Sequence, residues 1–475
     1  MEKIKKLIYS NRISICLLLF IISLCFFLLL FFSKDPDYYW HIKAGEYMFK
    51  NHTILTHDVF SWYLNGKYWM SHEWLFEVIL YGLSIVFPRY HIVVYTISML
   101  VGLSITLFFS NKDGYKKNIP FTLCWITFLI SFYGMIQARP YMISFILFAL
   151  CLYFLFDLKK NENSRKIYFL PLISVIWSNV HGGSSNLPYL FIIIFLVTGL
   201  FSFSCSKIES SKNTKKQNIK YLIAFVLCVL AIIINPHGIK MLVYPYQNMA
   251  DKLMQANISE WHPTNLSNLS HYPYLILIAL IFFTFLFSKR KINFLDLIIF
   301  IFVFFLGMKS IRFWPYTYIS MSFIVFDYVS VRKYDNGTCG VILMVTLLCI
   351  LLFVINIKNI KNKCNIKMLN DEIIEIIKKE KPKRLYNFYD YGGYLVYKNI
   401  PVFVDGRADL YSSYNYSDYL GISNLSGEYE DLIKYYDFDY YLVPDKFPIY
   451  NYLKYSDNYK LIMYSNHVVF YQKIS

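Results

Sequence analysis

Long apolar runs constrain this chain more than any other feature of its sequence. Residues 13–32, 272–288 and 341–357 approach or reach the roughly 20 residues that a helix needs to cross a bilayer. Hydrophobic residues fill 56% of the 475 positions and charged residues only 16%, which is more apolar surface than one soluble core buries. The sequence therefore predicts a polytopic α-helical membrane protein with about 11 to 12 transmembrane helices.

Basic residues indicate how these helices are oriented. The net charge is +16, but the basic residues are scattered over short loops instead of forming one stripe, so we expect no nucleic-acid partner. They recur in alternate loops, which the positive-inside rule places in the cytoplasm. These loops are residues 1–12, 112–117, 159–166, 207–220, 289–291 and 332–333. The intervening loops then lie outside, and they contain almost every unusual polar residue.

The start of the chain and the number of crossings decide the topology. No small-residue cleavage site follows the first apolar run, so residues 1–12 are expected to be a cytoplasmic N-terminus, with a membrane domain over residues 13–357. Between the external residue Glu73 and the cytoplasmic residue Lys112, only an odd number of crossings fits. Two apolar stretches lie there, residues 74–87 and 91–110, and we expect the shorter, residues 74–87, to form an interfacial or half-crossing helix. About eleven full spans then place the C-terminal region outside, although Lys358, Lys361 and Lys363 after the last span oppose this.

Two regions outside the bilayer are long enough to carry chemistry. In the first external loop, residues 34–73, we expect helices that lie in the interface with Trp and Tyr at headgroup level. Residues 358–475 are expected to form a small extracytoplasmic α/β domain with a helix at residues 369–379 and a final hairpin around Ser465-Asn466. Its other expected elements are strands near Leu385, Val402, Tyr441, Leu461 and Val469 and helices near Tyr419 and Leu432. Residues 391–394 and 404–407 are unusual glycine segments, either functional or simple turns at strand ends.

Two carboxylates follow the first span directly, at Asp35 and Asp37. A carboxylate at this place can take a proton from an acceptor hydroxyl, or it can hold a divalent cation such as Mg²⁺ or Mn²⁺ against a donor phosphate. The alternative interpretation is that both acids are solvated groups flanking a helix. The spacing alone does not decide between these readings.

Further polar groups stand at the external ends of several helices. Ionisable groups near bilayer depth cost about 2.5 to 3.5 kcal/mol each, which indicates that they are used. Arg139 and Arg312 suit the paired oxygens of a phosphate, and His181 or His237 can hydrogen-bond the same anion. Snorkelling or helix capping is the alternative for any one of them. Together they predict an anion-binding cavity.

Several of these segments resemble a known family. Asp35-Pro36-Asp37-Tyr38-Tyr39-Trp40-His41-Ile42, with residues 58–63 and 71–77, is similar to the first loop of bacterial GT-C type membrane glycosyltransferases. In the tail, residues 388–395 resemble the Trp-Trp-Asp-Tyr-Gly segment of oligosaccharyltransferase catalytic subunits. Phe388 and Tyr389 stand where that motif has tryptophans, and the glycine is doubled.

The resemblance implies a fold, a donor and a set of site residues. Members of the superfamily use polyprenyl phosphate sugars as donors. Asp35 or Asp37 would then be the catalytic base or a metal-holding acid. The expected substrate-binding residues are His41, Asp58, His72, Glu73, Arg139, His181, His237 and Arg312.

The leading hypothesis is an inverting glycosyltransferase of cell-envelope glycan biosynthesis. It would move a sugar from a polyprenyl-phosphate-linked donor to a glycan, lipid or protein acceptor outside the cytoplasm. No phosphate-binding glycine loop, nucleophile elbow or metalloprotease helix points to another enzyme class. The alternative is a lipid-glycan transporter or a non-catalytic glycan-binding scaffold, in which Arg139 and Arg312 rather than the acids would govern function.

Overall fold

The computed structural model describes residues 19–27, 29, 35–110, 135–328, 336–356 and 368–474. The chain divides into two compact units, each made of segments that are distant in sequence. Unit 1 contains Met1–Ser33, Tyr90–Pro245 and Ile258–Cys364, and unit 2 contains Lys34–Arg89, Tyr246–Asn257 and Asn365–Ser475. The expected cytoplasmic residues 1–12, 112–117 and 332–333, half of the first apolar run and the lysines at 358–363 lie outside the described residues.

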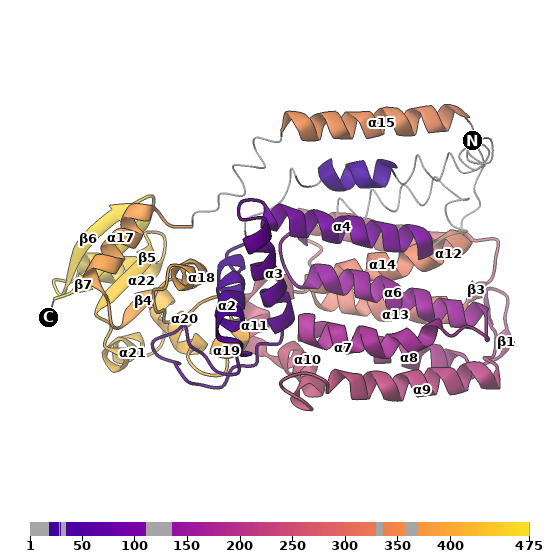
Figure 1. Cartoon of the computed structure of the whole chain (residues 1–475), viewed down its shortest axis with the longest axis horizontal. Coiled ribbons are helices and arrows are strands. Elements are labelled where there is room, and N and C mark those ends of the chain that lie inside the picture. The colour runs from indigo at the N-terminus through magenta and orange to yellow at the C-terminus, as the bar shows by residue number, and fades with distance from the viewer. Residues whose placement is uncertain are drawn as a thin grey trace. The chain divides into compact units, whose positions relative to one another are not determined.

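Unit 1 consists mainly of apolar helices, most of which run side by side (Figure 1). Its main helices are α4 (His91–Ser110), α6 (Tyr141–Lys160), α7 (Leu170–Val180), α8 (Leu187–Thr198), α9 (Lys215–Ile232), α12 (Tyr272–Phe287), α13 (Phe294–Lys309), α14 (Trp314–Ile324) and α15 (Asn336–Ile355). Three described segments are long and apolar enough to cross a membrane: His91–Ser110, Tyr141–Lys160 and Leu269–Phe287. The first and third confirm expected apolar runs, and together they indicate a membrane protein.

The predicted anion-binding residues His181 and Arg312 of unit 1 lie in short connections between these helices. The single-turn helix η8 (Ile311–Phe313) directly precedes α14, and η5 (Gly182–Ser184) ends shortly before α8. Both α8 and α14 have proline in the first turn, where the missing N–H needs no partner. The remaining short elements are η4 (Lys166–Phe169), η6 (Ser259–Trp261), η7 (Leu269–His271), η9 (Val325–Asp327) and the small sheet β1 (Phe203–Ser204), β2 (Ile208–Ser210) and β3 (Ile292–Asn293). His181 and Arg312 therefore lie where one helix ends and the next begins.

Unit 2 begins with two helices of the first loop. The helices α2 (Tyr38–Asn51) and α3 (Trp74–Val86) pack against each other. A methyl group on Gly45 of α2 would lie 2.0 Å from the carbonyl oxygen of Glu77 in α3, so only glycine permits this approach. With 13 residues, α3 is shorter than a bilayer span, as expected, and its place at the interface stays a prediction.

The C-terminal part of unit 2 contains a four-stranded mixed sheet. The strands β4 (Leu385–Asn387), β5 (Tyr440–Pro444), β6 (Tyr459–Ser465) and β7 (Val468–Lys473) have the order β4-β5-β7-β6, and only the β4–β5 pair is parallel. All five residues of β5 are buried, as a continuous apolar run in a central strand predicts. The helices of this part are α17 (Asp371–Glu380), α18 (Tyr389–Tyr397), α19 (Ala408–Tyr411), α20 (Tyr416–Asn424), α21 (Tyr429–Tyr436) and α22 (Pro448–Tyr455). Unit 2 also contains α11 (Lys252–Asn257). The helix α10 (Lys240–Ala250) begins in unit 1 and passes into unit 2 after Pro245.

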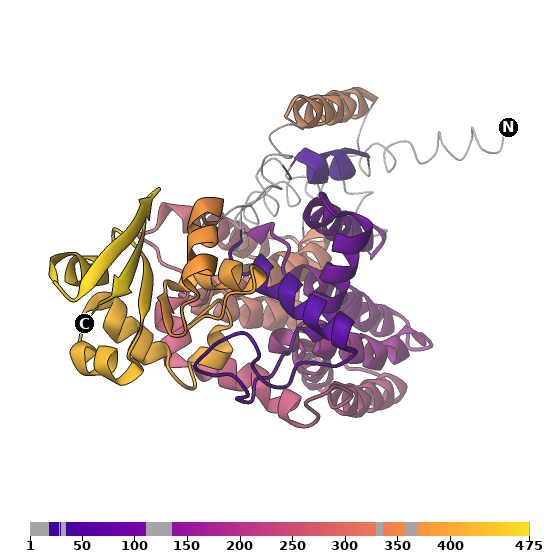
Figure 2. The same ribbon diagram turned by 60° about the vertical axis from the view of Figure 1, so that its left-hand side comes forward.

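Most expected elements of the tail are confirmed. The final hairpin joins β6 and β7, which Figure 2 shows as two adjacent yellow arrows. Its turn residues Asn466 and His467 both have positive φ, 49° and 62°, as the tight turns of hairpins require. The expected helices at residues 369–379, near Tyr419 and near Leu432 correspond to α17, α20 and α21.

One local expectation, a strand near Val402, is wrong, and the turn alternative for residues 391–394 is excluded. Val402 forms a single parallel bridge to Ser61 of the first loop instead of a strand of the main sheet. Residues 391–394 are not a turn but the middle of α18, where the two glycines serve close packing. A methyl group on Gly392 would lie 2.2 Å from the Val404 carbonyl oxygen, and one on Gly393 would lie 2.8 Å from that of Pro36.

Candidate functional site

The two candidate catalytic acids lie at the start of α2. Asp35 is 2% exposed, and its Oδ1 accepts a hydrogen bond from the backbone N–H of Asp37 at 3.1 Å. Asp37 precedes the first residue of α2 and lies against the tail, since a methyl group on Gly406 would be 1.7 Å from its Oδ1. The glycine at 406 therefore makes room for the Asp37 carboxylate.

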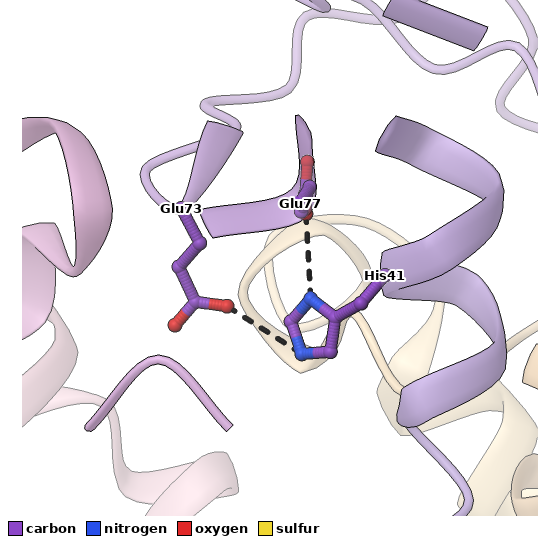
Figure 3. Close-up of side chains that lie close together, drawn as sticks. All are labelled: His41, Glu73 and Glu77. Atoms are coloured by element: carbon purple, nitrogen blue, oxygen red, sulfur yellow. Dashed lines mark hydrogen bonds and ion pairs between the residues drawn. The ribbon is translucent and has the colours of Figure 1, made fainter. Parts of the chain in front are cut away.

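One turn further along α2, His41 lies between two glutamates of α3 and its cap (Figure 3). The ring Nδ1 is 3.4 Å from Glu77 Oε1, and the ring Nε2 is 3.7 Å from Glu73 Oε2. His41 and Glu77 are fully buried and Glu73 is 8% exposed. Among the described residues, this is the group of three that could hold a metal ion, with one ligand atom from each residue lying within 4.8 Å of the others.

Outer partners hold the second oxygen of each glutamate. Glu73 Oε1 is 3.1 Å from Nε2 of His72, whose Nδ1 is 3.6 Å from Oδ2 of Asp409. Burial lowers the pKa of an imidazole, but attraction by Glu73 and Asp409 outweighs this and raises the pKa of His72 to about 10. The Ser71 hydroxyl donates to Glu77 Oε2 at 3.1 Å. Burial, followed by repulsion from Glu73, still raises the pKa of Glu77 well above its usual range.

A buried ion network joins the first loop to the tail within unit 2. The guanidinium of Arg407, 1% exposed, donates to both carboxylate oxygens of Asp405, from Nε at 2.9 Å to Oδ1 and from Nη2 at 2.6 Å to Oδ2. Its Nη1 donates to Asp58, which also accepts from the backbone and hydroxyl of Ser61. The hydroxyl of Tyr411 completes the network between Arg407 and Asp405. Asp58, predicted to bind substrate, therefore binds Arg407.

Aromatic rings connect this network to the His41 group. The Arg407 guanidinium lies 4.8 Å from the ring centroid of Trp69, which meets Trp40 edge-on at 6.1 Å. Trp40 in turn packs on the ring of His41, with the centroids 3.7 Å apart. These contacts fix the loop between α2 and α3 and, with it, the positions of Glu73 and Glu77.

Asp58 makes the stability of unit 2 sensitive to acid. Burial raises the pKa of a carboxyl, but attraction by Arg407 and hydrogen bonds from Ser61 outweigh it and lower the pKa of Asp58. The stabilisation is therefore present above the unfolded-state pKa of about 3.9 and is lost as pH falls through the folded-state value. We expect Asp58→Asn to lower the melting temperature at pH 7 and to flatten its decrease between about pH 5 and pH 2, measured by thermal unfolding in detergent.

The exposed Asp457 supplies the matched control for this prediction. Asp457→Asn should keep both the melting temperature and the pH profile of the wild type. An Asp58→Asn profile that parallels the wild type at every pH would contradict the role of the Asp58–Arg407 pair.

In unit 1 the structure brings together two predicted anion-binding residues. Arg312 Nη2 donates to His181 Nε2 at 2.7 Å, which leaves the imidazole proton on Nδ1. That nitrogen lies 2.7 Å from the hydroxyl of Ser144 and 3.0 Å from that of Ser184. Arg312 also lies 4.9 Å from the ring centroid of Trp261. The arginine is thus oriented from several sides, and its side chain stays 20% exposed.

The other two predicted anion-binding residues are also in unit 1. The hydroxyl of Tyr95 donates to the carbonyl oxygen of Arg139 at 2.8 Å, which fixes the turn before α6. His237 is 8% exposed, and its backbone N–H donates to Asn235 Oδ1 at 2.7 Å.

Sequence reasoning missed four residues of the unit 2 site: Glu77, Asp405, Arg407 and Asp409. Glu77 follows Glu73 by four positions, a spacing that places both on one helix face, and this signal was readable. The other three lie more than 300 positions from the first loop. Only the glycine between Asp405 and Arg407 marked their segment as unusual.

Solved structures of the Archaeoglobus fulgidus oligosaccharyltransferase, AglB, are similar to this chain. The apo form covers 90% of this chain and 69% of its own, with a TM-score of 0.56 and 11% sequence identity. The chain has a GT-C fold. Two further structures of the archaeal enzyme match this GT-C fold at a TM-score of 0.52 and 12% identity, each over 90% of this chain. One is tethered to an acceptor peptide containing the NVT sequon and is covered over 68% of its length, and the other is a complex with an inhibitory peptide and a dolichol-phosphate, covered over 69%.

The likeness confirms the expected oligosaccharyltransferase-like fold, although the sequences have diverged widely. No protein-family model matches the sequence, and no curated protein matches it either. Because one fold hosts several chemistries, the function has to be argued from the residues of the site.

Proposed function

We propose that this chain is an inverting membrane glycosyltransferase that moves a sugar from a polyprenyl-phosphate-linked donor to an acceptor outside the cytoplasm. The observation that carries the proposal is the pair Asp35 and Asp37, held at the start of α2 in a GT-C fold. A dolichol-phosphate accompanies the archaeal enzyme in one solved structure, which supports a lipid-linked phosphate as the carrier. The acceptor is a glycan, a lipid or a protein.

The proposal assigns proton removal to Asp35 or Asp37. The acceptor hydroxyl gives its proton to the carboxylate while its oxygen bonds to the anomeric carbon of the sugar. The bond from that carbon to the phosphate oxygen breaks, and the phosphate leaves with the electron pair. Attack from the face opposite the phosphate inverts the configuration of the sugar. His41, His72 and Glu73 are assigned to shaping the surroundings of these aspartates. Asp58 is assigned to substrate binding, in the orientation that its pairing with Arg407 gives it.

The leaving phosphate needs positive charge. The proposal assigns this role to Arg312 and His181, with Arg139 and His237 as further donors, because charged N–H groups bind phosphate oxygens strongly. The Arg312–His181 contact supports it, since a pre-oriented guanidinium loses little freedom on binding an anion. A divalent cation such as Mg²⁺ or Mn²⁺ is the alternative source of this charge.

The proposal includes a topology. About eleven spans within residues 13–357 would leave the first loop, residues 34–73, and the tail, residues 358–475, on the extracytoplasmic side of the cell membrane. A donor carried by a membrane lipid and an acceptor of the cell envelope would then both be within reach of the same face.

Transfer of labelled sugar from a polyprenyl phosphate donor pool tests the proposal. We expect membranes with the wild-type chain to form a labelled lipid or polymer. We expect Asp35→Asn, Asp37→Asn or the double variant to reduce the rate by about 10²- to 10⁴-fold, because a general base is lost. The exposed Asp457→Asn should keep the wild-type rate.

Other outcomes identify other functions. Equal rates in the wild type and the double variant across several donors would contradict the proposal and favour a lipid-glycan transporter or a scaffold. A transporter forms no new glycosidic bond under any condition, so a product with a new bond excludes that alternative.

A further inference from the structure

His41, Glu73 and Glu77 form a compact group whose donor types suit a metal ion. The group offers one imidazole nitrogen and two carboxylate oxygens, one ligand atom each, within 4.8 Å of one another. Ligands that each bind one ion at about 2.1 Å are about 3 to 4 Å apart, so small rotations of the two glutamate side chains close the site. The side chains converge in Figure 3 from α2 and from the start of α3.

The residues around His41, Glu73 and Glu77 are arranged like the outer hydrogen-bond partners of protein metal sites. One oxygen of each carboxylate points towards His41, and the other is held from outside, by His72 on Glu73 and by Ser71 on Glu77. Ligating carboxylates usually have such outer partners.

The helices α2 and α3 pack closely beside His41, Glu73 and Glu77. Gly45 lies one turn after His41 on α2, and it lets the backbone of α2 approach Glu77 more closely than any side chain would allow. This approach brings the imidazole to the glutamates. A connection between α2 and α3 at this point would fix the whole first loop.

We propose that His41, Glu73 and Glu77 bind one first-row divalent metal ion that links α2 to α3. The imidazole ligand and the burial of the group favour Zn²⁺ or Mn²⁺ over Ca²⁺, which takes six to eight oxygen ligands, and over Mg²⁺, which keeps several waters. The ion is a structural part of unit 2, so the inference does not depend on the glycosyltransferase proposal.

Metal content of the full chain tests the inference. The chain is purified in detergent with an affinity tag that lacks histidine, loaded with Zn²⁺ or Mn²⁺, dialysed and analysed by mass spectrometry of the elements. We expect about one ion per chain in the wild type and at least a tenfold lower content in His41→Ala and in the isosteric Glu77→Gln. Ser71→Ala should weaken binding about tenfold, as loss of an outer partner does. His57→Ala, which removes an exposed histidine of the same loop, should keep the wild-type content.

Thermal unfolding supplies a second readout that needs no variant. Chelation should lower the melting temperature of the wild type, and Zn²⁺ or Mn²⁺, but not Mg²⁺ or Ca²⁺, should restore it. A wild-type chain that retains less than about a tenth of an ion after loading, with a melting temperature unaffected by chelation, would overturn the inference and leave a proton-sharing cluster. Equal metal content in His57→Ala and His41→Ala would overturn it too, because the bound ion would then lie elsewhere. Sugar transfer is not measured, so failure here is distinct from failure of the proposed function.

Discussion

Replacing Arg407 by leucine will lower the free energy of unfolding of unit 2 by about 3 to 5 kcal/mol. The substitution leaves Asp58 and Asp405 buried without their cation, and an uncompensated buried charge is far more costly than the loss of a contact. Both carboxylates are fully buried, so water cannot replace the guanidinium. The measurement is hydrogen exchange of the amides in β5, whose residues are all buried, in the full chain in detergent. Exchange should become roughly 10²- to 10⁴-fold faster.

Arg384 provides a matched control for this substitution. It pairs with Asp437 at 3.1 Å, but both side chains are about half exposed. Exposed pairs contribute at most about 1 kcal/mol, so Arg384→Leu should change exchange in β5 by less than about tenfold. Similar effects of the two substitutions would show that the buried network does not hold the first loop and the tail together.

Replacing Gly45 by alanine will destabilise unit 2 by about 1 to 3 kcal/mol, although alanine is the better helix former. The added methyl group would lie 2.0 Å from a backbone oxygen, which cannot rotate away as a flexible side chain could. The helices α2 and α3 must therefore separate, and His41 moves away from both glutamates. Thermal unfolding of the full chain should show a lower melting temperature.

Gly82 in α3 provides the control for the Gly45→Ala substitution. A methyl group there meets no atom within 4 Å, so Gly82→Ala should raise stability by up to about 1 kcal/mol through helix propensity alone. The same substitution is thus expected to have opposite signs at two helical glycines of one unit. If both variants melt at higher temperature than the wild type, the close approach of α2 and α3 is not a constraint on the native state.

Sequence patterns predicted the elements of the tail where a local rule applies. The two segments around Ser465-Asn466 indicated the hairpin of β6 and β7, and the helix expected at residues 369–379 corresponds to α17. For residues 391–394 the sequence left a functional segment and a turn open, because two adjacent glycines usually mark a turn. In α18 they are helical, since packing against Val404 and Pro36 needs the missing Cβ atoms, and no local pattern reports such a requirement.

The sequence by itself determined that this is a helical, apolar chain and that two acids, Asp35 and Asp37, closely follow its first apolar run, because hydropathy and spacing along the chain are local properties. The tertiary structure alone decided which distant groups meet. It paired Asp58 with Arg407, 349 positions away, and His72 with Asp409, and it placed the first loop and the tail in one unit. A buried ion pair forms wherever folding brings opposite charges together, and the chain length between them leaves no periodic signal. For this reason the sequence predicted only substrate binding for Asp58, and its pairing with Arg407 became visible in the fold.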